Sequence, residues 1–142
     1  MEAGKSAQKT EKASLRKLLR SGFYGPDRAV TKAKGSQDGM AALASLLSDR
    51  DASIRRNACW SLYKMLRGKH VVSMPTPPPE VFEALGRALG DKDPHVSHGA
   101  ASALGGFLKA MDDGSVSRFA LRQMLSPALP YMKKHGIATE GI

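Results

Sequence analysis

The chain has 142 residues, 42% of them hydrophobic and 25% charged, which is the size and composition of one globular domain. No apolar run reaches the roughly 18 to 20 residues needed to cross a bilayer, and the single cysteine, Cys59, excludes an internal disulfide or a thiolate metal site. The net charge of +9 favours an acidic partner, and the lack of an apolar segment after the first lysines predicts an intracellular protein without a secretory signal.

The first 38 residues carry more than half of the net positive charge and predict a basic, partly irregular N-terminal arm. Leucines on one side predict an amphipathic helix over 12–20, and its flanking cations are Lys12, Arg16, Lys17 and Arg20. Glycines and a proline predict an irregular tether over 21–39. We expect the arm either to cap the rest of the chain or to dock on a partner.

An internal repeat organises the remaining sequence, because residues 43–66 and 85–108 align without a gap at an offset of 42. Each copy predicts a short helix, a turn with two aspartates, and a longer helix whose apolar residues recur every three or four positions. Asp51 and Asp93 stand where the longer helix needs an N-cap, and Pro94 follows at the first helical position, where a missing N–H costs nothing.

The repeats define the expected organisation of a helical domain over 39–142. Its parts are a first repeat at 39–68, a proline-rich connector at 69–79, a second repeat at 79–111, and a partial repeat or cap at 115–135. The prolines of the connector forbid a helix, so they either stiffen the link or offer an extended ligand to a proline-binding domain. The partial repeat is either another helical hairpin or one helix bent at Pro127 and Pro130.

Both copies share spaced leucines, the two aspartates of the turn, and an isoleucine or valine, an alanine and two leucines in the long helix. This pattern resembles the HEAT repeat, a close relative of the armadillo repeat. The resemblance implies an all-α helical-hairpin solenoid, with the second helix of each hairpin on the concave side, that binds and scaffolds other macromolecules. The pair Ile54–Arg55 matches the family's hydrophobic-arginine step, whereas Val96–Ser97 departs from it, so no continuous arginine ladder is expected.

The sequence contains no enzyme motif, such as a glycine-rich phosphate loop or a nucleophile elbow, and predicts a non-enzymatic protein without cofactor, metal or small-molecule substrate. His95 and His98 have a spacing that could share a metal, but no third ligand lies near them, which favours a solvated or capping pair. The aspartate pairs recur at the same turn, so they indicate helix caps rather than an acid–base pair.

The outer face of the first long helix is the most informative feature. At 100° per residue, the apolar residues of this helix group on one side, and the opposite side carries Arg56, Trp60, Tyr63, Lys64 and Arg67. The rings need cover, which a protein partner, a nucleic acid or the chain itself would supply. In the second copy the equivalent face carries few bulky side chains and includes His98, Gly105 and Lys109. Glycine within a helix is unfavourable, so Gly99, Gly105 and Gly106 predict that another segment or a partner closely approaches the backbone of this helix.

These features predict a scaffold subunit that binds other protein subunits of a larger assembly through the long-helix face and the basic arm. We expect it in the cytoplasm or in a cytoskeletal, ciliary or organellar assembly. The alternative is a nucleic-acid-binding accessory protein of a ribonucleoprotein or DNA complex, in which the same cations contact phosphates.

Overall fold

The computed structural model describes residues 2–20, 25–33, 36–67, 76–110 and 117–137, which form eight α-helices and one short 3₁₀ helix. In chain order these are α1 (Glu2–Arg20), α2 (Gly25–Ala33), α3 (Gln37–Ser45), the 3₁₀ helix η1 (Leu46–Ser48), α4 (Ala52–Arg67), α5 (Pro79–Ala88), α6 (Pro94–Ala110), α7 (Arg118–Leu125) and α8 (Leu129–Lys134). The part of the chain so described contains no strand.

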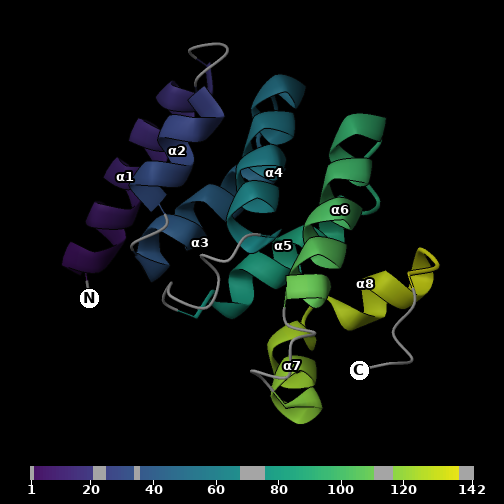
Figure 1. Ribbon diagram of the computed structural model, residues 1–142. Helices are drawn as coiled ribbons and strands as arrows, with labels where there is room; N and C mark the ends of the chain where they lie inside the picture. The colour runs from purple at the N-terminus through teal and green to yellow at the C-terminus, as the bar shows by residue number, and fades with distance from the viewer. Residues whose placement is uncertain (1, 21–24, 34–35, 68–75, 111–116, 138–142) are drawn as a thin grey trace.

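The first six helices form three hairpins, α1–α2, α3–α4 and α5–α6, that stack side by side (Figure 1). In each hairpin the first helix contacts the first helix of the next, so α1, α3 and α5 form one layer, called here the A layer. The second helices, α2, α4 and α6, form the B layer, in which α4 and α6 make the most extensive contact of any helix pair. The predicted all-α helical-hairpin solenoid is therefore confirmed.

Side-chain caps explain why the long helices begin where they do. The carboxylate of Asp51 accepts hydrogen bonds from the backbone N–H and the hydroxyl of Ser53, at 2.9 and 2.7 Å. The carboxylate of Asp93 accepts from the backbone N–H groups of His95 and Val96, at 2.9 and 3.3 Å. Each aspartate supplies acceptors to first-turn N–H groups that have no partner within the helix, so the predicted caps are confirmed.

The apolar positions that the repeat predicted are buried in both copies except at Leu108, which is only partly buried whereas its equivalent Leu66 is buried. In α4 and α6 they include Ile54, Ala58, Leu62, Val96, Ala100 and Leu104, each with 0% of its surface exposed. Phe82 and Phe107 add an aromatic pair between α5 and α6, with ring centroids 5.0 Å apart. The matched burial shows that the two hairpins use one packing scheme.

The N-terminal region differs from the expected arm. The helix predicted over 12–20 is part of the longer helix α1. The irregular tether predicted over 21–39 is wrong, because this range contains the helix α2 and the first residues of α3, including Gly39. Gly25 and Pro26 begin α2 because proline is tolerated in a first helical turn. Gly39 allows α2 and α3 to approach closely, since a Cβ there would lie 3.0 Å from the backbone of Ala33.

This N-terminal hairpin packs on the first repeat. Leu15 and Leu19 of α1 and Ala29 and Ala33 of α2 belong to the buried core, and the side-chain amide of Asn57 in α4 donates to the Leu19 carbonyl at 2.9 Å. The hairpin therefore caps the open edge of α3 and α4, which is one of the two roles expected of the arm.

At the other end, the segment predicted as a partial repeat forms two short helices, α7 and α8, separated by a turn at 126–128. Both helices pack on α5, and neither makes a comparable contact with α6 among the described residues (Figure 1). The B layer of the described structure thus ends at α6. Most of the connector predicted at 69–79 lies outside the described residues.

Candidate interaction surface

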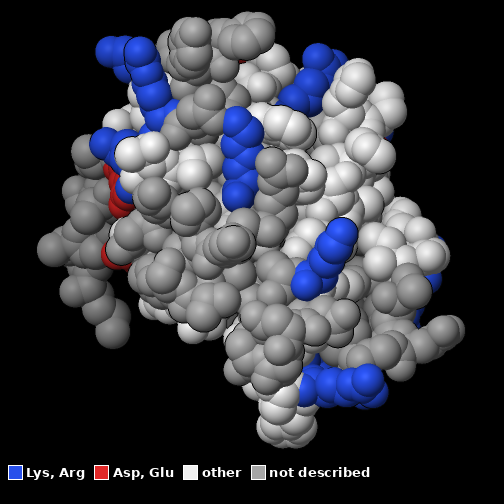
Figure 2. All heavy atoms as spheres, viewed as in Figure 1, with Lys and Arg blue, Asp and Glu red and all other residues white. Residues whose placement is uncertain are grey.

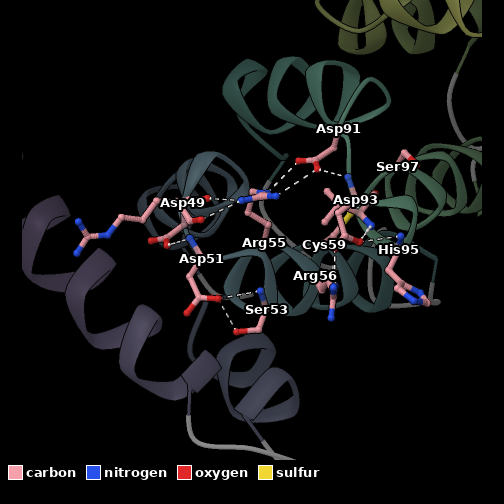
Figure 3. Close-up of polar contacts among 12 residues, drawn as sticks. Asp49, Asp51, Ser53, Arg55, Arg56, Cys59, Asp91, Asp93, His95 and Ser97 are labelled. Carbon is pink, nitrogen blue, oxygen red and sulfur yellow. Dashed lines mark hydrogen bonds and ion pairs between the residues drawn. The ribbon is translucent and has the colours of Figure 1, made fainter.

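A buried arginine links the turns of the two repeats. The guanidinium of Arg55, on α4, donates to the carboxylate of Asp91 at 3.0 and 3.4 Å and to the carbonyl of Asp49 at 2.9 Å (Figure 3). The side chains of Arg55 and Asp91 are only 11% and 12% exposed. Because arginine offers a fixed fork of donors, a single side chain satisfies acceptors from two consecutive turns.

The same contact occurs one hairpin earlier. Arg16 of α1 donates to the carboxylate of Asp49 at 2.7 and 3.3 Å. Hydrogen bonding by Arg16 lowers the pKa of Asp49, and the carboxylate raises the pKa of Arg16 in turn. Arg16 was predicted as a partner-binding residue of the basic arm, but the structure places it in an ion pair within the molecule.

The other cations predicted for the arm, Lys12, Lys17 and Arg20, have exposed side chains on α1. They remain candidates for contact with a partner.

Asp93 forms the third contact of this kind. It accepts hydrogen bonds from Arg56 at 2.9 and 2.6 Å while it caps α6. These hydrogen bonds, from Arg56 first and from the backbone of His95 and Val96, lower the pKa of Asp93 to about 2. Arg56 remains 47% exposed, so part of the guanidinium still faces solvent.

The aromatic residues of α4 lie one turn beyond Arg56. Trp60 is 48% exposed, and its ring lies 5.2 Å from that of Tyr63 at a tilt of 31°. The ammonium of Lys64 is 5.6 Å from the centre of the Trp60 ring, within the range of a cation–π contact. Tyr63 and Lys64 are half-buried, so the cluster is held in place while the indole keeps an open side. Arg67 ends α4, and its side chain is not among those described.

The corresponding face of α6 is bare. His98, Gly105 and Lys109 are exposed, and a Cβ added to Gly105 would meet no atom within 4 Å. The structure thus places these three residues on the helix beside Trp60, but it shows no contact that would explain Gly105.

Gly99, by contrast, has an explanation within the chain. A Cβ at this position would lie 3.1 Å from the sulfur of Cys59, so the glycine allows α6 to pack closely on α4. The close approach predicted for the glycines of this helix is thus made at Gly99 by the chain itself, and no partner is needed there.

Cys59 lies in this contact between α4 and α6. Its side chain is buried, and its thiol is 3.5 Å from the carbonyl of Val96. Burial raises the pKa of the thiol to about 12, which keeps it protonated and unreactive at neutral pH. The prediction of a small buried side chain is confirmed.

Acidic residues are unevenly distributed over the helices, a feature that periodicity alone did not indicate. The B-layer helices α4 and α6 and the C-terminal helices α7 and α8 contain no aspartate or glutamate, whereas α2 of the B layer contains Asp27. The A-layer helices all contain acids, namely Glu2, Glu11, Asp38, Glu80 and Glu83. The signal is present in the sequence, but it can be recognised only when each helix has been assigned to a layer.

Two further features of the described residues bear on other functions. A groove of about 800 Å³ lies on the A-layer side, where Asp38, Glu80 and Glu83 face Lys12 and Arg87, so its charges are mixed. No group of three or more metal-binding side chains occurs in the described part, and none of its helices is long and apolar enough to cross a membrane.

A known repeat family matches part of this chain. The family model of the HEAT repeat matches residues 40–68, which cover most of α3, η1 and α4. No curated protein matches the chain. Among solved structures, an engineered protein from the Northeast Structural Genomics Consortium is similar over 85% of this chain and 62% of its own, with 19% identity and a TM-score of 0.46. The resemblance to HEAT repeats is confirmed at residues 40–68, and such repeats generally mediate protein–protein interactions.

Proposed function

We propose that this chain is a non-enzymatic scaffold subunit that binds another protein through the B-layer face of α4 and α6. The observation that carries the proposal is Trp60, which remains 48% exposed although the N-terminal hairpin already packs on the same helix. An exposed indole loses about 1.5 to 3 kcal/mol of hydrophobic free energy relative to a buried one, and tryptophan is enriched among interface hot spots.

The surroundings of Trp60 suit a protein interface. Its ring is fixed by Tyr63 and Lys64, so little side-chain entropy is lost when a partner covers it. Arg56 and Lys109 supply exposed cations on the two adjoining helices, and Lys17 is an exposed cation on α1, whereas Lys12 lines the groove of the A layer. The apolar side of α1 is buried against the rest of the molecule, so we infer that only the exposed cations of α1 are available to a partner.

Nucleic acid is the weaker candidate. The affinity of a protein for nucleic acid depends largely on how many phosphates its lysines and arginines neutralise. In Figure 2 the described lysine and arginine side chains lie in separate groups on the visible face. One side of the Trp60 ring is also taken by Lys64 and Tyr63, which reduces its use as a stacking platform for bases.

A photocrosslinking experiment tests this proposal. A benzophenone amino acid is placed at Lys109 of α6 or at Lys17 of α1, and in the control variant at Lys133 of α8, an exposed lysine on a different part of the molecule. In living cells, irradiation should give discrete protein adducts from Lys109 and Lys17 and few from Lys133. Adducts that disappear on nuclease treatment, or equal adducts from all three positions, would overturn the proposal.

A further inference from the structure

The B-layer face has an unusual charge pattern beside its exposed tryptophan. The two long helices that form it, α4 and α6, carry arginine, lysine and histidine but no carboxylate. Asp51 and Asp93 sit in the turns at the N-termini of these helices, where capping hydrogen bonds hold both of them and Arg56 also holds Asp93. Within α4 and α6 themselves, no acidic residue therefore lies between Trp60 and the C-terminal ends of the two helices.

The two helices of this face differ in the bulk of the side chains that they expose. In the internal repeat, Ser102 of α6 corresponds to Trp60 of α4, and Gly105 corresponds to Tyr63. On α4 these positions carry two neighbouring rings tilted by 31°, whereas α6 is bare at Gly105, where a Cβ would have open space around it. A polypeptide segment that crosses from α4 to α6 at this level meets an indole on one side and an approachable backbone on the other.

The cations flank that path. Lys64 lies beside the Trp60 ring, and Lys109 lies one turn beyond Gly105 on the neighbouring helix. Adjacent packed helices have axes about 8 to 10 Å apart, which is the reach of about three residues of extended chain. Two carboxylates with this spacing on one segment can contact both lysines while an apolar residue between them covers the indole.

From this arrangement we infer that the partner presents an acidic segment with an apolar residue near its centre, and that this segment lies across Trp60, Lys64, Gly105 and Lys109. The inference rests on the proposed protein-binding function and adds the chemistry of the partner. Electrostatic complementarity selects such a segment, because a basic segment would meet cations of its own sign with no carboxylate on either helix to compensate.

The test is a binding titration of the full chain with a fluorescein-labelled peptide of about twelve residues, long enough to cross both helices. The peptide has glutamate at alternate positions and a central leucine, and the reference peptide has glutamine in place of every glutamate. Fluorescence anisotropy should show binding of the acidic peptide that weakens with added salt, and binding of the neutral peptide that is at least about 10-fold weaker.

Substitutions locate the site. Trp60→Ala should weaken binding of the acidic peptide about 10-fold, and Lys64→Gln and Lys109→Gln about 3-fold each. The matched controls are Phe119→Ala, which removes another exposed aromatic side chain (74% exposed), and Lys133→Gln, which removes an exposed lysine of α8. Both controls should bind as the unmodified chain does, and helical circular dichroism should confirm that every variant is folded.

Two results would overturn the inference. One is equal binding of the acidic and neutral peptides, and the other is an equal loss in the controls and in the α4 and α6 variants. A mixed-sequence single-stranded DNA that binds more tightly than the acidic peptide, and loses affinity with the same variants, would assign the face to nucleic acid. Failure of the peptide titration together with protein adducts from Lys109 would reject the acidic segment and leave the scaffold function standing.

Discussion

The junction between α4 and α6 and the junction between α6 and the C-terminal helices start from the same repeated sequence and have different outcomes. At the first, Arg55 and Arg56 reach two aspartates of the following turn, and the helices pack closely. At the second, the equivalent residues are Ser97 and His98, and both α7 and α8 pack on α5. The apolar pattern thus builds each hairpin, whereas the arginine–aspartate contacts accompany the stacking of one hairpin on the next.

The largest expected difference between the two junctions is in thiol reactivity. Cys59 is buried in the first junction. The residue of α6 at the same position of the repeat is Ala101, which is half-buried. The variant that combines Cys59→Ala with Ala101→Cys should react with an aromatic disulfide reagent at least about 100-fold faster than the unmodified chain. The reason is that the buried thiol of Cys59 can react only after local unfolding exposes it. Equal rates would show that both sides of α6 are covered to the same extent.

The next largest effect is expected at the buried ion pair. Arg55→Ala leaves the Asp91 carboxylate and the Asp49 carbonyl without their donor in a site that is about nine-tenths buried, so the free energy of unfolding should fall by about 3 kcal/mol. Chemical denaturation measures this change. The matched variant Arg56→Ala removes an arginine that is 47% exposed, and it should lower the free energy of unfolding far less. Equal losses would mean that burial does not distinguish the two contacts.

Two glycines of α6 should respond with opposite signs. Gly105→Ala adds a methyl group to open space and gains helix propensity, so it should stabilise the protein by about 1 kcal/mol. Gly99→Ala places a methyl group 3.1 Å from the Cys59 sulfur, and it should destabilise the protein by a similar amount despite the same gain in propensity. Thermal denaturation of both variants checks the prediction, and a stabilised Gly99→Ala variant would show that α4 and α6 can separate without cost.

The smallest effect is expected in the acid range. The pKa of Asp93 is about 2 in the folded protein and higher in the unfolded chain, so its ionised form favours folding above about pH 4, and this contribution is lost as the pH falls toward 2. In Asp93→Asn the melting temperature should therefore depend less steeply on pH between about 4 and 2. An unchanged slope would show that the ion pair with Arg56 does not form in solution.

Much of the fold follows from the sequence because the repeat is strict. The offset of 42 predicts each aspartate cap and each buried position of the second copy from the first, and the structure agrees except at Leu108, which is partly buried. The prediction was wrong at α2, because Gly25 and Pro26 were interpreted as breakers although proline is tolerated in a first helical turn.

Less of the candidate site could be predicted. Periodicity placed Trp60 on the outer face of α4, and its exposure is consistent with that interpretation. The ion pair between Arg16 and Asp49 could not be predicted, because it joins residues 33 positions apart whose helices meet only after the N-terminal hairpin has packed. The role of Gly99 depends likewise on the distance between two packed helices, which no local pattern reports.

The order of the contacts along the chain has a consequence for synthesis on the ribosome. In the first three hairpins each helix of the A and B layers packs on the corresponding helix of the hairpin made just before it, and the ion pairs of Arg16 and Arg55 also join consecutive hairpins. Each hairpin can therefore dock as soon as it emerges, without waiting for distant sequence, and such local topology favours rapid folding. A pause in translation after α4 would leave a folded edge exposed rather than an unfolded chain.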